Sequence, residues 1–149
     1  MTNYEMAALA VQIVGFAGII VSIAMVYRQI QSSVFCEYTK RYNEIELSLN
    51  PFIRDEMFDK PYDAFSDDQR AEIRAATRRY LNLCSEEFHL NQHKFIHRTT
   101  WQVWDLGIQR MLSVNAVSGA VAEIHKEFQY FKDFHDYLLK KARIVAADA

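Results

Sequence analysis

The longest apolar stretch of the sequence lies near its start. No charged residue occurs from Met6 to Tyr27. As a helix, these residues would extend roughly 33 Å, which matches a hydrocarbon core about 30 Å thick. A core helix of a soluble protein normally carries a polar face, and this stretch has almost none. We therefore expect residues 6–27 to form a transmembrane helix, preceded by a short non-cytoplasmic tail, residues 1–5.

The residues that flank this stretch favour a retained anchor over a cleaved signal peptide. A signal peptide begins with a positively charged region and ends at a cleavage site of small residues. Here the first five residues, MTNYE, include no Lys or Arg, and Tyr27-Arg28 makes a poor cleavage site. Because Arg28, Lys40 and Arg41 all follow the stretch, the positive-inside bias predicts that residues 28–149 form a cytoplasmic domain.

One side of the expected transmembrane helix carries small and polar residues. Its members recur at steps of three or four residues and are Ala8, Gln12, Gly15, Ile19 and Ser22, with Gly18 close by. Small residues let helix backbones approach one another, and an amide such as that of Gln12 is costly against lipid. We interpret this side as a contact face for other transmembrane subunits or for a second copy of the chain. The alternative is that small residues are simply common in membrane helices.

Apolar positions continue at helical spacing beyond the anchor, and no Gly or Pro occurs between Gly18 and Pro51. The stripe consists of Tyr27, Ile30, Val34, Tyr38, Tyr42, Ile45 and Leu49. This spacing predicts one long helix from about Tyr4 to Leu49, amphipathic in its second half. Asn50-Pro51 then has the pattern of an N-cap and a first helical residue, which predicts a short helix from Pro51 to about Phe58.

A second helical pattern follows a predicted loop over residues 59–65. Ser66 and Gln69 have the spacing of a capping box, which predicts a helix from there to about Phe95. Its inward positions are Ile73, Ala76, Tyr80, Leu83, Cys84 and Phe88. With few glycines and prolines to force turns, long helices are favoured over strands.

Two further helical regions are expected after residue 98. Thr99 or Thr100 would cap a helix that carries Trp101 and Trp104, and residues 113–118 would interrupt the helical pattern. The last region carries Phe128, Phe131, Phe134, His135 and Leu138. The sequence therefore predicts an all-α protein: a transmembrane helix that continues into a long amphipathic helix, packed with a small cytoplasmic helical bundle.

Charge and cysteine content narrow the classes of function. The formal net charge is −2, with 17 basic and 19 acidic residues, so the basic excess typical of a nucleic-acid-binding protein is missing. Cys36 and Cys84 are the two cysteines. In a helical domain that is not secreted, we expect both to be reduced.

The layout of the chain resembles that of a group of short bacterial single-pass membrane proteins of uncharacterised function. The resemblance is carried by the N-terminal anchor, the Tyr-rich segment from Glu37 to Tyr42, the Trp101-x-x-Trp104 helix and the Phe-rich C-terminal helix. It covers most of the chain in layout and defines no active site. It implies a location in the bacterial inner membrane and nothing about activity.

Metal-binding chemistry is suggested by a row of histidines, His89, His93 and His97, which stand four residues apart. Histidines at i and i+4 can bind one metal ion from one face of a helix, and Glu86 precedes His89 at the spacing of half a di-iron motif. No other glutamate is followed by a histidine three residues later. The simpler interpretation is a polar helix end with exposed histidines, and no cofactor is expected.

Three other groups of residues have both a functional and a structural interpretation. A catalytic pair of Cys84 with a histidine is conceivable, although its acidic neighbours do not favour a reactive thiolate. A basic row could bind anionic lipid or an acidic partner, or could be an ordinary solvated face. It consists of Arg70, Arg74, Arg78 and Arg79. Trp101 and Trp104 could line a ligand pocket, but with Phe128 and Phe131 they are more simply residues of the domain core or of a docking surface.

Three functional hypotheses follow. The leading one is a non-catalytic accessory or scaffold subunit of a membrane protein complex, whose anchor contacts the lipid bilayer and other transmembrane helices. The second is a metal-dependent enzyme or metal-binding protein that uses Glu86, His89 and His93. The third is a membrane-anchored signalling or stress-response module that acts through the long helix.

Overall fold

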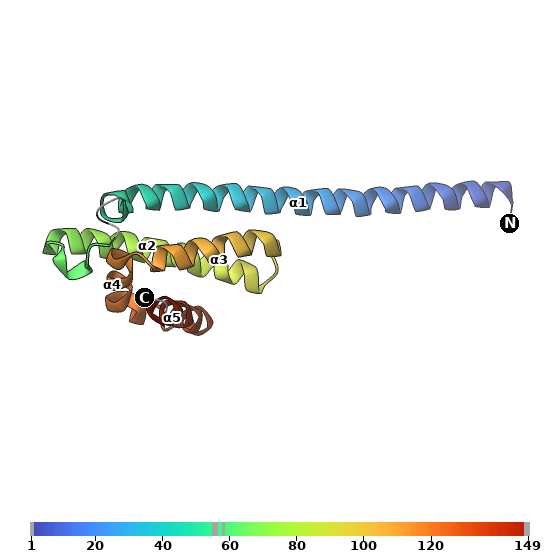
Figure 1. Ribbon diagram of the computed structural model, residues 1–149. Helices are drawn as coiled ribbons and strands as arrows, with labels where there is room; N and C mark the ends of the chain where they lie inside the picture. Colours follow the sequence, from blue (N-terminus) through green and yellow to red (C-terminus); the bar gives the residue numbers. More distant parts are fainter. Residues whose placement is uncertain (1, 55–56, 58, 148–149) are drawn as a thin grey trace. The chain divides into compact units, whose positions relative to one another are not determined.

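The computed structural model describes residues 2–54, 57 and 59–147, with backbone alone for residues 3 and 142–147. All of its secondary structure is helical, and the described residues contain no strand, so the predicted all-α class is confirmed (Figure 1). The elements are α1 (Asn3–Ile53), η2 (Tyr62–Ala64), α2 (Asp67–Gln92), α3 (Arg98–Leu112), α4 (Asn115–Ile124), η3 (His125–Phe128) and α5 (Lys132–Ala147).

The predicted continuous first helix is present in α1, but the predicted helix end near Leu49 is wrong. α1 runs to Ile53 and includes Pro51, so Asn50 is no N-cap. Burial explains the difference, because Leu49 and Phe52 are 0% and 5% exposed and face the core from one continuous helix. Residues 51–53 of the expected short helix belong to α1, and its residues 55, 56 and 58 lie outside the described part of the chain.

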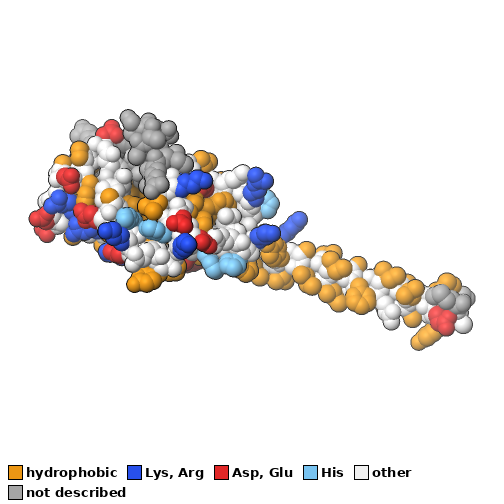
Figure 2. Space-filling model, turned by 90° about the horizontal axis from the view of Figure 1, so that it is seen from below, with side chains coloured by type: hydrophobic (Ala, Val, Ile, Leu, Met, Phe, Trp, Pro, Cys, Tyr) orange, Lys and Arg blue, Asp and Glu red, His pale blue; other side chains and the backbone are white. Residues whose placement is uncertain are grey.

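The chain divides into two compact units between Cys36 and Glu37. The first unit is the N-terminal part of α1, and most of its large apolar side chains are exposed (Figure 2). The hydropathy of this helix averages 2.4 over its most apolar window of eighteen residues, none of which is buried. By length and composition it is a candidate membrane span.

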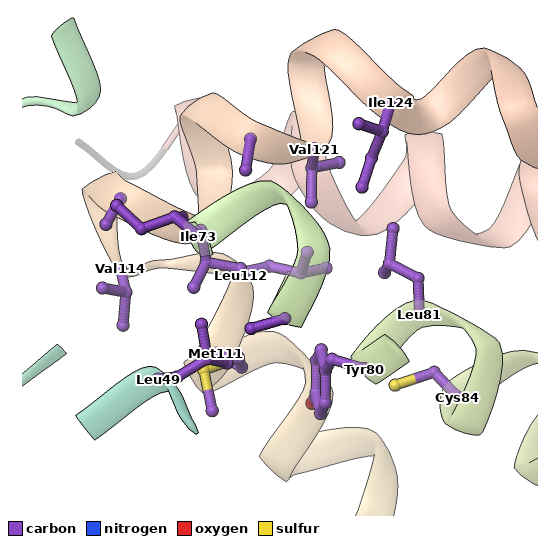
Figure 3. Packing of buried hydrophobic residues seen from close by; sticks show 14 of the residues in the cluster. Leu49, Ile73, Tyr80, Leu81, Cys84, Met111, Leu112, Val114, Val121 and Ile124 are labelled. Carbon is purple, nitrogen blue, oxygen red and sulfur yellow. The ribbon is translucent and has the colours of Figure 1, made fainter. Parts of the chain in front are cut away.

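The second unit has one hydrophobic core, built from the C-terminal part of α1 and the other helices. Figure 3 shows Leu49 of α1 close to side chains of α2 and α3, with Val121 and Ile124 of α4 on the other side. The largest completely enclosed side chains include Tyr80, Leu49, Ile73, Leu81, Leu83, Ile108, Leu112 and Leu138. Such side chains supply most of the free energy that stabilises a small domain.

α2 begins as predicted and ends earlier than predicted. The capping box is confirmed, since Gln69 N donates to Ser66 Oγ and Ser66 N donates to Gln69 Oε1. The helix ends at Gln92 rather than near Phe95. Lys94 has a φ of 58°, a left-handed turn conformation that terminates helices.

α3 is capped by His97, so the prediction of Thr99 or Thr100 as the cap is wrong. Thr99 N donates to His97 Nδ1 at 3.3 Å, and Trp101 N donates to the His97 carbonyl oxygen at 3.1 Å. Nδ1 of the imidazole accepts the backbone hydrogen bond that a hydroxyl or carboxylate oxygen usually accepts at an N-cap. The usual sequence preferences for N-caps are for small polar residues, so they do not predict a histidine at this position.

The predicted interruption at residues 113–118 is too long, because α4 already begins at Asn115. Burial of the apolar side chains of α4 favours a helix more strongly than the polar residues Ser113, Asn115 and Ser118 favour a turn. These buried side chains are Ala116, Val117, Ala120, Val121 and Ile124. The last helical region is also divided, into η3 with buried Phe128 and α5 with buried Phe134 and Leu138.

Candidate functional site

The contact face expected on the first unit is exposed over its whole length. Ala8, Gln12 and Ile19 lie on the surface of α1, and no heavy atom lies within 4 Å of a Cβ placed on Gly15 or Gly18. Ser22 Oγ donates to the Gly18 carbonyl oxygen at 2.8 Å. The Ser22 hydroxyl is therefore satisfied within its own helix, which leaves the Gln12 amide as the main polar group of this face.

A hollow of about 780 Å³ lies on the surface of the second unit. It lies between the C-terminal part of α1 and α2, with Phe131 from the segment before α5. We call it the α1–α2 hollow. Its lining residues are Tyr38, Arg41, Glu44, Ile45, Arg79, Asn82, Ser85, Glu86, His89, Leu90 and Phe131.

One ion pair dominates the lining of this hollow. Arg41 donates to both carboxylate oxygens of Glu86, at 2.7 and 3.1 Å, and Tyr38 Oη donates to Glu86 Oε2 at 3.0 Å. The guanidinium of Arg41 lowers the pKa of Glu86, while burial and the bond to Glu86 raise the pKa of Tyr38 to about 12. The carboxylate of Glu86 is thus engaged in joining α1 to α2.

The three histidines do not act as one group. α2 ends between His89 and His97, and His97 is used as the cap of α3. His89 and His93 remain together, with ring centroids 4.3 Å apart. In the described part of the chain, no three His, Cys, Asp or Glu side chains are placed to hold one metal ion.

The structure places Cys84 in the core and Cys36 on the surface of the first unit. Cys84 is completely buried beside Tyr80, and this burial raises the pKa of its thiol well above the usual range. A high pKa favours the unreactive thiol over the thiolate. His89 and His93 are both exposed, so the conceivable catalytic pair of Cys84 with either of them is not assembled.

Two members of the basic row, Arg74 and Arg78, join α2 to α4 and η3. Arg74 Nη1 donates to Glu123 Oε2 at 3.0 Å, and Arg78 donates to Glu127 through Nε and Nη2, at 2.5 and 2.7 Å. Arg70 pairs with Asp67 within α2. Arg79 lines the α1–α2 hollow instead.

Aromatic rings join α2, α3 and α5. Phe88 contacts Trp101, Phe134 and Tyr137, with ring centroids 5.0–6.0 Å apart. Trp104 instead stacks on Tyr38 of α1, at 5.5 Å. Of the other aromatic residues singled out from the sequence, Phe128 is buried, whereas Phe131 is 59% exposed at the rim of the α1–α2 hollow.

Several residues of this surface give no local signal in the sequence. The partners Arg41 and Glu86 are 45 positions apart, and both Arg–Glu pairs between α2 and the α4–η3 segment are separated by 49. The local signal for the two pairs between α2 and the α4–η3 segment is that Arg74 and Arg78, like Glu123 and Glu127, are four residues apart.

Comparison of the chain with protein-family models, curated proteins and solved structures finds no match.

Proposed function

We propose that this protein is an accessory or scaffold subunit of a membrane protein complex, anchored by residues 6–27. The exposed apolar surface of the first unit carries this proposal. A helix whose most apolar window is wholly unburied needs lipid or protein around it, because apolar surface of this size is strongly unfavourable in water.

The position of Gln12 favours protein neighbours over lipid alone. Its amide lies within an otherwise apolar helix, and Gly15 offers open space one turn away for a second backbone. An amide that finds a hydrogen-bonding partner across a helix interface avoids an unsatisfied polar group in hydrocarbon. The resulting function is non-catalytic: the anchor contacts other transmembrane helices, and the second unit offers a helical surface for docking.

The charges that follow the anchor support the cytoplasmic position that we propose for the second unit. Arg28 and Lys40 lie on the C-terminal side of the apolar run, and the N-terminal side has no Lys or Arg. The bacterial inner membrane is part of the same proposal and rests on the resemblance in layout alone.

Extraction from native membranes with a mild detergent tests this proposal. We expect the full chain to migrate on a native gel in a particle larger than a monomer and to co-purify with defined membrane proteins or with a second copy. Gln12→Leu should reduce the recovered complex, because it keeps the approximate size of the side chain and removes the amide. Val14→Leu, on the opposite side of the helix, is the matched control and should leave the complex intact. A wild-type chain that migrates as a lone monomer contradicts the proposal.

A further inference from the structure

His89 and His93 form a close pair at the C-terminal end of α2. Their ring centroids lie 4.3 Å apart, and both side chains are exposed. Histidines at i and i+4 on one helix face are a recurrent arrangement for binding a transition-metal ion. In the described structure, no hydrogen bond or ion pair occupies their ring nitrogens.

The residues next to this pair are committed to other contacts. Glu86 is held by Nη1 and Nη2 of Arg41 and by Tyr38, so its carboxylate is not available without breaking an ion pair. His97 caps α3 through Nδ1. Since no three His, Cys, Asp or Glu side chains of the described residues are placed to hold one ion, a site in this region has these two histidines as its ligands from the described part of the chain.

We propose that His89 and His93 chelate one divalent late-transition-metal ion, such as Cu²⁺ or Zn²⁺, as an open two-histidine site. Imidazole nitrogen suits these ions, and among divalent first-row ions Cu²⁺ binds most tightly to such ligands. The remaining coordination positions are filled by water or by a ligand from solution. Two donors held close together, His89 in the last turn of α2 and His93 at its C-cap, bind more tightly than either alone, because the second bond forms at a high effective concentration.

The surroundings of the pair keep these remaining positions accessible. His89 lines the α1–α2 hollow and also a second, smaller hollow of about 250 Å³, which Ser85 and Phe131 share. A metal ion on His89 would therefore face open, partly polar space. This inference is independent of the proposed assembly, since it concerns only the second unit.

Titration of the purified full chain in detergent micelles, without a polyhistidine tag, tests the site with Cu²⁺. We expect one ion per chain, with an electron paramagnetic resonance spectrum showing hyperfine coupling to two imidazole nitrogens. His89→Ala and His93→Ala should each weaken binding by about tenfold or more and remove the two-nitrogen signature.

Two control variants separate this site from the alternatives. His97→Asn keeps an acceptor at the cap of α3 and should bind Cu²⁺ like the wild type. Glu86→Gln should also leave the spectrum unchanged. The inference is overturned if the wild type binds no Cu²⁺, if either alanine variant binds as the wild type does, or if the His97 or Glu86 variant loses the signal equally.

Discussion

At the scale of single residues, Glu87 is a carboxylic acid enclosed by the second unit, with 5% of its surface exposed. Burial raises its pKa to about 8; the nearby Arg41 opposes this shift, and Glu86 adds to it. The charge of Glu87 also raises the pKa of five titratable neighbours, which are Tyr38, Tyr42, Tyr80, Cys84 and Tyr137. The folded protein therefore keeps a proton on Glu87 at pH values where the unfolded chain has released it.

Because the folded protein keeps this proton on Glu87, its free energy of unfolding depends on pH. Because the folded pKa lies above the unfolded value, the contribution of Glu87 to stability is fully present at acid pH and is lost as the pH rises through about 8. Glu87→Gln keeps the shape and removes the ionisation. We expect it to raise the free energy of unfolding at pH 9 by roughly 1–3 kcal/mol and to change it little at pH 5.

Fluorescence of Trp101 and Trp104 during unfolding in urea would measure this effect, because both report on the second unit. Glu72→Gln, at an exposed position of the same helix, is the control and should give no such difference between the two pH values. A Glu87→Gln variant as stable as the wild type at pH 9 would show that the carboxylate is hydrated in the folded state.

At the scale of elements, the contact of η2 with α4 depends on one glycine. A Cβ at Gly119 would overlap Tyr62 Cβ and its ring. This close approach lets Tyr62 Oη reach Glu123 and Arg74, each at 3.2 Å. Gly119→Ala should therefore destabilise the protein by roughly 1–3 kcal/mol, in line with overpacking elsewhere.

Gly107 provides the matched control, because it also lies within a helix and a Cβ placed on it would have no heavy atom within 4 Å. Gly107→Ala should stabilise the protein by about 0.5–1 kcal/mol, since alanine favours the helix. Urea unfolding of both variants gives the comparison. If the two substitutions change the free energy of unfolding equally, Tyr62 can move away from residue 119 without a loss of stability.

The elements that the sequence predicts well are those with strong local signals. The apolar stretch that opens α1 and the capping box of α2 needed no knowledge of distant residues. The end of α1 and the early start of α4 differ from the prediction, because burial of Phe52 and Val117 by remote segments overrides the local preference. The cap of α3 differs because the acceptor is an imidazole nitrogen of His97 instead of a small polar side chain.

The same distinction applies to the candidate site. The spacing of His89 and His93 is local and was visible in the sequence, whereas the engagement of Glu86 by Arg41 and the separate role of His97 depend on tertiary packing.

At the scale of the whole molecule, the two units place their hydrophobic surface differently. The clustered core residues all lie between Ile45 and Leu138, inside the second unit, and the first unit buries none of its most apolar window. A fragment of residues 37–149 should therefore fold cooperatively and stay in the supernatant without detergent. The full chain should sediment with membranes.

High-speed centrifugation followed by circular dichroism distinguishes these outcomes. A full chain that remains in the supernatant without detergent would show that α1 is covered in some other way than by lipid. A fragment without helical signal would mean that the first unit is needed for folding.

The close approach of Tyr62 and Gly119 has an evolutionary consequence. The overlap that a side chain at position 119 would create begins at Tyr62 Cβ, an atom that every residue except glycine possesses. Shrinking the aromatic ring to alanine would leave this overlap in place. In any lineage that retains this packing, we therefore expect glycine at one of the two positions.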